Sequence, residues 1–314
     1  MVYLAAFSKV LPVLLLIGLG ALLRRTRFLN EAAIGGFKQL VVNITLPASL
    51  FLAFAGVTLE AGHMVVAALV FALCGAALLL GRLRRPLFGV DSAYLPPLLT
   101  GFEAGMMGYA IYGAVFGSGS IFQFAVIDLG QVLFVFFVLA PYVQRLGAGP
   151  VDFSTTLRNF LRTPVILSIL LGIAANRTGV MALADSRPVS AALVETLRLL
   201  AAVTTPLIAL VIGYEVNWQH DKLAAPLRTL GLRLIFWVPA GLLINWLVVG
   251  PLFPGDRLLQ AAVMTMFVLP PPFVIPIFMT DAQASDQAYV VNTLSAATVV
   301  TLVAFTLVSV VYAA

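Results

Sequence analysis

The sequence predicts an all-α, polytopic membrane protein with ten transmembrane helices, arranged as two inverted five-helix repeats in which helices 4 and 9 are broken and cross. Three observations predict this fold. The 314 residues are 61% apolar and only 10% charged, with a mean hydropathy of +1.07, whereas about a quarter of the residues in a soluble domain are charged. Apolar runs recur along the whole chain. Proline and glycine clusters interrupt two of these runs at corresponding places in the two halves.

The apolar runs approach the length of about 20 residues that a membrane-crossing helix needs. Basic residues concentrate in the first, third, fifth and seventh connections between the runs; Arg24, Arg25 and Arg27 lie in the first. Because Lys and Arg in short loops stay cytoplasmic, we expect a multi-pass protein of the inner or plasma membrane with both termini outside. The net charge of +5 follows this topology and does not indicate nucleic-acid binding. The expected spans are 3–23, 32–55, 62–81, 93–116, 120–143, 163–180, 190–215, 226–249, 257–279 and 287–312.

The helix breakers repeat with a period of half the chain. LPP (95–97), followed by GFEAGMMG (101–108), interrupts the fourth expected span, and LPPP (269–272) interrupts the ninth. Five spans followed by five similar spans place the second copy upside down in the membrane. The predicted domains are a first repeat at 1–143, a cytoplasmic connection at 144–162 and a second repeat at 163–314.

Unwound backbone at mid-membrane depth is tolerated only where it lines a cavity or is buried in protein. Crossed half-helices present N–H groups and positive dipole ends that suit an anion such as a carboxylate. The alternative is that the prolines only kink packed helices. The matched clusters favour a binding site, whose expected residues are Asn43, Pro47, Glu103, Gly105, Met106, Pro270, Pro271, Pro272 and Asn292.

Two carboxyl groups inside expected spans are candidates for proton or ion coupling. Glu103 lies among the glycines of the fourth span, where an ionised carboxylate costs at least about 2.5 kcal/mol and needs a partner, a cavity or a proton. Asp128 is the second candidate, although a packing role beside Gln131 explains it equally well. Asn43, one turn before Pro47, either satisfies backbone carbonyls freed by that proline or faces the substrate.

Other charged residues are expected to have structural or solvent-facing roles. Lys38 is expected to extend toward the cytoplasmic edge, and Glu215 to be solvated at the end of its span. Glu195 and Arg198 have the spacing of an ion pair on one helix face. The sequence has no HExxH, GxSxG or Walker glycine motif, and it therefore predicts no enzyme, metal site or bound cofactor. Active transport would have to draw on a gradient of H⁺, Na⁺ or the solute itself.

Four segments resemble the auxin efflux carrier family of membrane transporters, which includes plant auxin exporters and bacterial carriers assigned to malonate or malate. The segments are LVVNITLPASLF (40–51), LRTPVILSILLGIAANRTGV (161–180), TTPLIALVIGYEV (204–216) and PPPFVIPIFMTDAQASDQAYVVNTLSAATVVTL (270–302). The chain looks like a bacterial member. The resemblance implies the same ten-helix inverted repeat, with both termini outside. Since the family is similar to bile acid sodium symporters and sodium/proton antiporters, it also implies a scaffold of helices 1, 2, 6 and 7, a moving core of helices 3–5 and 8–10, and a homodimer.

The chain departs from the family pattern in the fourth span. The resemblance aligns a Gly-Asn pair with FEAGMMGYA (102–110), so that Glu103 stands where the asparagine is usual and Ala110 where a proline is usual. An ionised glutamate would repel an organic anion. Either Glu103 is protonated when substrate binds, or it binds sodium, or the substrate is not a simple anion.

The first hypothesis is a secondary active transporter of a small organic anion, such as a mono- or dicarboxylate or an auxin-like acid. It would be linked to protons and work by an elevator-like form of alternating access in the lipid bilayer. A sodium-coupled solute symporter of the bile acid type is the alternative. A membrane sensor, from a different class, would be expected to carry a cytoplasmic output module, and none is expected between the last predicted span and Ala314.

Overall fold

The computed structural model of the protein describes residues 2–57, 59–84, 88–147, 153–181, 188–215, 223–279 and 282–312, and these ranges contain helices but no strand. Six helical segments are long and apolar enough to cross a membrane, and a bent pair of helices makes a seventh if it is one span. The ten spans and the inverted repeat stay predictions. A count of ten is reached only if the first helix and the two interrupted segments also cross the membrane. The six are Glu31–Gly56, Ala61–Leu83, Ser118–Leu146, Pro188–Glu215, Ala224–Leu252 and Ala284–Tyr312.

Most expected spans correspond to helices that run without a break, although several contain a short π-helical turn. The turn before Pro47 illustrates the cause, since proline has no N–H to donate to the preceding turn. The elements are α1 Val2–Arg25, α2 Glu31–Leu40, η1 Val41–Thr45, α3 Leu46–Gly56, α4 Ala61–Arg84, α7 Ile121–Phe134, η5 Val135–Leu139, α8 Ala140–Gly147, α10 Pro164–Thr178, α12 Pro188–Glu215, α13 Ala224–Ile244, η6 Asn245–Val249, α14 Gly250–Leu252 and α16 Ala284–Tyr312.

The helix is interrupted within both segments in which the sequence predicts a break. In the first, α5 (Leu95–Leu99) ends before an extended Thr100 with φ −129° and ψ 167°, and helix resumes in η3 (Ala104–Gly108) and α6 (Tyr109–Phe116). In the second, α15 (Arg257–Val268) ends at an extended Leu269 with φ −65° and ψ 155°. Irregular backbone follows, and then the single 3₁₀ turn η7 (Pro276–Phe278).

The two proline clusters act differently. Pro96 and Pro97 lie at the start of α5, where a missing N–H leaves no hydrogen bond unmade, and the interruption comes after them, at residues 100–103. The cluster at 270–272 lies within the second interruption itself. The expectation that LPP breaks the fourth span is therefore corrected: the prolines begin a half-helix, and the following segment ends it.

Part of the expected hydrophilic connection is helical. Residues Phe153–Arg162 form α9, and the axis bends by 63° between this helix and α10. Thr163 at the bend has φ −64° and ψ 127°, as expected for a residue that precedes a proline.

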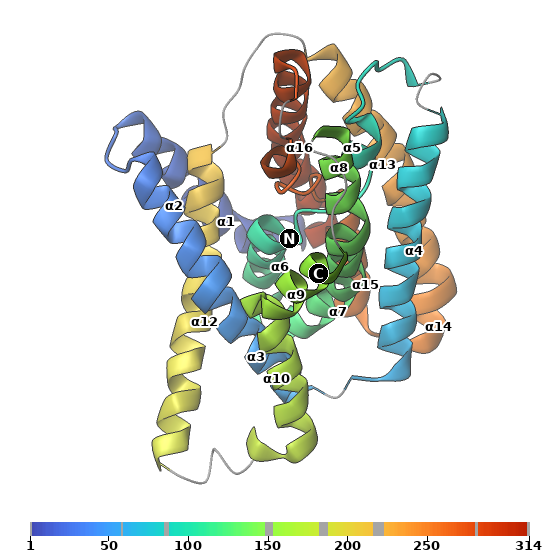
Figure 1. Ribbon diagram of the computed structural model, residues 1–314. Helices are drawn as coiled ribbons and strands as arrows, with labels where there is room; N and C mark the ends of the chain where they lie inside the picture. The colour runs from blue at the N-terminus through green and yellow to red at the C-terminus, as the bar shows by residue number, and fades with distance from the viewer. Residues whose placement is uncertain are drawn as a thin grey trace.

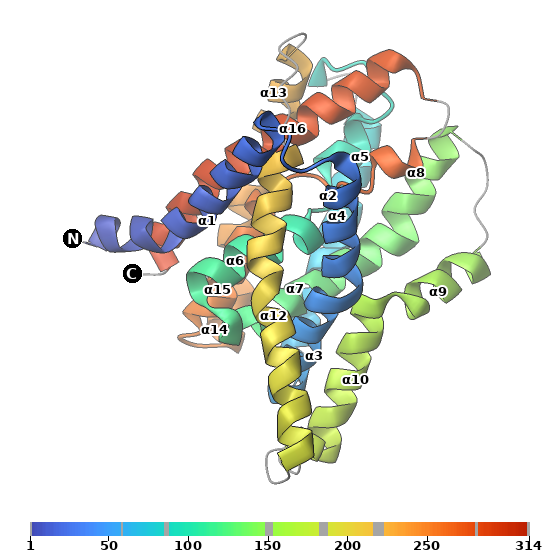
Figure 2. The ribbon, with the colours of Figure 1, turned by 90° about the vertical axis from the view of Figure 1, so that its left-hand side faces the viewer.

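Figure 1 shows α2, α3 and α12 along one side of the molecule and α4 and α13 along the other, with α6, α7 and α15 between them. Large, fully buried side chains such as Tyr112, Phe124 and Phe267 come from these central helices. Figure 2 marks both chain ends at the same edge, where α1 and α16 run in contact. The central helices thus hold the two interruptions inside the molecule.

Helices α1 and α12 pack closely because glycines lie at their contact. A Cβ added at Gly20 would lie 2.1 Å from the Leu210 carbonyl oxygen, and one added at Gly213 would lie 1.9 Å from the Ile17 carbonyl oxygen. Small residues that let two backbones approach are typical of helix contacts in membranes. These two glycines therefore fix the distance between the first helix and α12.

Gly20→Ala is expected to lower the apparent melting temperature of the purified protein, because the added methyl group must push α1 away from α12. Gly18→Ala, on the same helix, is the control, since a Cβ there meets nothing within 4 Å and alanine favours helix more than glycine. Thermal unfolding in detergent measures both variants. Equal losses of stability in the two would contradict the close packing at Gly20.

Candidate functional site

The two interruptions contact each other directly. The backbone N–H of Glu103 donates to the Pro270 carbonyl at 2.9 Å. Gly101, with φ +66°, lies against Pro272, whose Cγ would be 2.8 Å from an added Cβ. Irregular backbone from the first half of the chain is therefore hydrogen-bonded to irregular backbone from the second half, inside the protein.

The Glu103 side chain joins the two interruptions. Its Oε1 accepts from the backbone N–H of Met106 at 2.9 Å, and its Oε2 accepts from the backbone N–H of Phe273 at 2.6 Å. The residue is 8% exposed, and Gly105 lies against Oε1. A carboxylate bonded through both oxygens is the strong, charge-assisted kind of acceptor. The Glu103 side chain thus binds N–H groups at the crossing, where the sequence predicts that a solute anion binds.

Asp128 belongs to a buried polar network next to this carboxylate. Its Oδ2 accepts from the Tyr109 hydroxyl at 2.9 Å, and its Oδ1 accepts from Gln131 Nε2 at 3.3 Å. The same Gln131 amide donates to the Phe102 carbonyl at 2.7 Å. Asp128 is therefore linked, through one side chain, to the residue that precedes Glu103, and it also lies beside Gln131 as the packing alternative expects.

Arg233 on α13 was missed by the sequence analysis. Its guanidinium donates to the carbonyls of Leu98 at 2.9 Å, Gly101 at 2.9 Å and Leu269 at 3.1 Å, and the residue is only 4% exposed. Trp237 Nε1, one turn later, donates to the Leu99 carbonyl at 2.9 Å. The sequence signal that could have identified Arg233 is that it is the lone charged residue within the apolar run 230–244.

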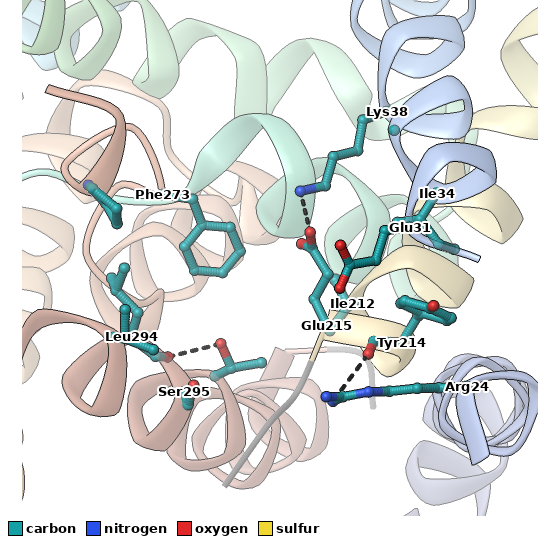
Figure 3. A pocket seen from close by; sticks show the side chains of 14 residues that line it. Arg24, Glu31, Ile34, Lys38, Ile212, Tyr214, Glu215, Phe273, Leu294 and Ser295 are labelled. Atoms are coloured by element: carbon teal, nitrogen blue, oxygen red, sulfur yellow. Dashed lines mark hydrogen bonds and ion pairs between the residues drawn. The ribbon is translucent and has the colours of Figure 1, made fainter. Parts of the chain in front are cut away.

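A cavity of about 490 Å³ lies between α1, α2 and α12 on one side and the second interruption and α16 on the other (Figure 3). Phe273 lines it and also donates its N–H to Glu103, so the carboxylate lies directly behind the cavity wall. The lining residues are Arg24, Glu31, Ile34, Gly35, Lys38, Ile212, Tyr214, Glu215, Phe273, Pro276, Val291, Leu294, Ser295 and Thr298.

Lys38 and Glu215 form an ion pair on the wall of this cavity (Figure 3). Both side chains keep partial access to solvent, at 41% and 37% exposed. The partial exposure fits the expectation that Lys38 extends toward the membrane edge and that Glu215 is solvated, and the pairing of these two distant residues at the cavity is an addition to it.

The predicted site residues separate into two groups. Glu103, Gly105, Met106 and the prolines at 270–272 gather at the contact between the interruptions. Asn43 is exposed, and its amide donates to the Gln39 carbonyl at 2.9 Å within its own helix. Pro47 is buried in α3. Asn292 is 4% exposed on α16, and the described lining of the cavity includes none of these last three residues.

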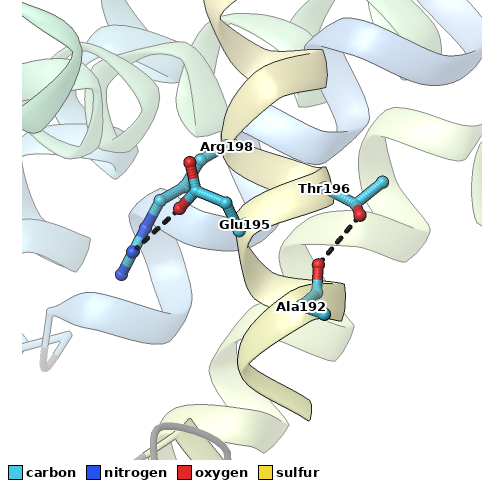
Figure 4. Close-up of polar contacts among 4 residues, drawn as sticks. All are labelled: Ala192, Glu195, Thr196 and Arg198. Atoms are coloured by element: carbon cyan, nitrogen blue, oxygen red, sulfur yellow. Dashed lines mark hydrogen bonds and ion pairs between the residues drawn. The ribbon is translucent and has the colours of Figure 1, made fainter. Parts of the chain in front are cut away.

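Glu195 and Arg198 form the predicted ion pair on α12, with 3.3 Å between Oε2 and Nη1 (Figure 4). Both side chains are more than half exposed. An exposed pair of this kind contributes little to stability. Since neither residue lines the cavity, the pair offers a matched control for Lys38 and Glu215.

Comparison with known proteins supports the general class. No family model matches the sequence, and the auxin efflux carrier family stays a resemblance. The chain is 24% identical over 242 residues to an uncharacterized transporter of Methanothermobacter thermautotrophicus, which covers 75% of this chain and 76% of that protein. Together with the apolar helices, this similarity indicates a multi-pass membrane protein related to transporters.

Proposed function

We propose that the protein is a secondary active transporter of a small organic acid, such as a mono- or dicarboxylate, and that its transport is linked to protons. The observation that supports this most is the charged cavity that ends against Glu103 where the two interruptions meet. The similarity to an uncharacterized transporter supports the class. In this proposal the chain lies in the cell membrane with both termini outside and acts as a homodimer.

The proposed mechanism is alternating access, in which a core of α4–α8 and α13–α16 moves against a scaffold of α1–α3, α10 and α12. Within the proposed scaffold α1 packs on α12 and α3 on α10, and within the proposed core α4 packs on α7 and α13 on α15, while α1 contacts α16 and α12 contacts α6 across the boundary. The cavity lies on the boundary between these groups, with Lys38 and Glu215 on the scaffold and Phe273 on the core. A solute bound there would contact both bodies.

Lys38 is the proposed partner of the solute carboxylate. It is paired with Glu215 on the cavity wall, so an entering carboxylate must compete with that side chain. Glu103 lies behind the wall, and its negative charge opposes an anion in the cavity. Protonation of Glu103 removes this repulsion and also weakens its bonds to Met106 and Phe273. A proton and an organic anion therefore favour each other's binding.

Screening of carboxylic acids and amino acids by thermal shift tests this function, since a ligand that binds only the folded protein raises its apparent stability. At least one mono- or dicarboxylate is expected to raise the melting temperature in a saturable way, and more strongly at lower pH. A screen in which amino acids or cations stabilise the protein and carboxylates do not would refute the proposed substrate class.

Substitutions of the ion pair are expected to act in opposite directions. Lys38→Met should weaken carboxylate binding about tenfold, because a hydrogen bond to a charged group contributes about 1.5–3 kcal/mol and partial exposure reduces this value. Glu215→Gln should strengthen binding, since it releases Lys38. Dissociation constants from the thermal shift measure both. Glu195→Gln and Arg198→Gln are the controls and should change nothing; parallel effects in all four variants would count against a role for Lys38.

A further inference from the structure

We infer that the Arg233 guanidinium is a resident cation at the contact between the two interruptions, and that the protein therefore transports without binding sodium there. The inference rests on the proposed function and assigns its coupling ion. It starts from the observation that one buried side chain donates to carbonyls of both interruptions.

The carbonyls that Arg233 binds are those expected to attract a cation. Leu98 lies in the last turn of α5, Gly101 lies in the interruption two residues beyond that helix, and Leu269 follows the end of α15. The last carbonyls of a helix have no partner within it and carry partial negative charge. In transporters with broken helices, unwound carbonyls and half-helix C-terminal ends coordinate sodium. Here a guanidinium already occupies three such oxygens, and Trp237 donates to a fourth, that of Leu99.

The surroundings of Arg233 indicate that these carbonyls are what stabilises its buried positive charge. Within the described part of the chain, no carboxylate forms an ion pair with it. The Phe102 ring lies 5.2 Å from the guanidinium carbon and stacks on Phe267. A buried charge without partners is very costly. A sodium ion could replace the guanidinium only by leaving that charge unsatisfied, so the two cations exclude each other.

The two interruptions thus have both of their counterions within the chain. Glu103 supplies a carboxylate to the N–H groups, and Arg233 supplies a guanidinium to the carbonyls. Because α13 and both interruptions belong to the proposed core, the guanidinium would move with them during transport. Glu103 is the group of this arrangement to which the proposed function assigns the proton, and its side chain joins the two interruptions through Met106 and Phe273.

The wild-type protein gives the first test. Its melting temperature is measured in sodium chloride and in choline chloride at the same ionic strength, without any substrate. Equal values are expected. A saturable rise in the sodium series alone would overturn the inference. Because no substrate is present, this result does not depend on whether the protein carries organic acids.

The second test removes the resident cation. Arg233→Ala is expected to melt at a lower temperature and to recover part of the loss in millimolar guanidinium or sodium chloride, but not in choline chloride. Arg257→Ala is the control, since Arg257 also donates to a backbone carbonyl, that of Val311 at 2.7 Å, but is exposed. It should show no such recovery. A folded Arg233→Ala protein that neither ion stabilises would overturn the inference; if the variant does not fold, the wild-type comparison decides.

Discussion

Glu103→Gln is expected to abolish the pH dependence of transport and to lower its rate at least tenfold. Glutamine offers one acceptor oxygen where two backbone N–H groups, of Met106 and Phe273, now donate. Its amide N–H₂ cannot accept from the second donor, and it cannot take up a proton. A bond to a charged group contributes about 1.5–3 kcal/mol, and about 1.4 kcal/mol corresponds to tenfold. The measurement is uptake by proteoliposomes over a range of pH.

The control for this variant is Glu195→Gln, which removes a carboxylate from the exposed ion pair on α12. It should leave both the rate and its pH dependence unchanged. Transport by Glu103→Gln that keeps the wild-type rate and pH profile would show that the buried carboxylate carries no proton in the cycle.

Gly101→Ala is expected to destabilise the contact between the interruptions. A residue other than glycine in a left-handed conformation such as φ +66° costs about 1–3 kcal/mol, and the new Cβ would lie 2.8 Å from Pro272 Cγ. The glycine also supplies a carbonyl to Arg233. We therefore expect a fall of several degrees in the melting temperature and a loss of carboxylate binding, both measured by thermal unfolding.

Gly105→Ala provides the matched comparison in the same interruption. A Cβ there meets only Glu103 Oε1, at 3.8 Å, which is an ordinary contact. This variant should fold and bind as the wild type does. If Gly101→Ala were as stable as Gly105→Ala, the close approach of the two interruptions would not be needed for the fold.

Local signals in the sequence predicted most helices and both interruptions. The length of an apolar run indicates a span, and the Pro- and Gly-rich clusters indicated the two runs in which the helix is interrupted. The predicted role of LPP was nonetheless wrong, since Pro96 and Pro97 begin α5. The preference of proline for the first turn of a helix was available as a signal and favours this position.

The partners of the site residues could not be predicted, because they depend on the packing of distant segments. Glu103 was identified from its depth in the membrane, but its bond to Phe273 joins residues 170 positions apart. The pairing of Lys38 with Glu215 depends on the contact between α2 and α12. Arg233 binds only backbone carbonyls, and no residue type in the sequence marks such a partner.

The most direct test of the proposed function is carboxylate uptake by proteoliposomes that contain the wild-type protein, driven by an imposed pH gradient in the absence of sodium. We expect saturable uptake that a protonophore abolishes and that sodium does not stimulate. Uptake that requires a sodium gradient, or no uptake of any carboxylate that raises the melting temperature, would contradict it.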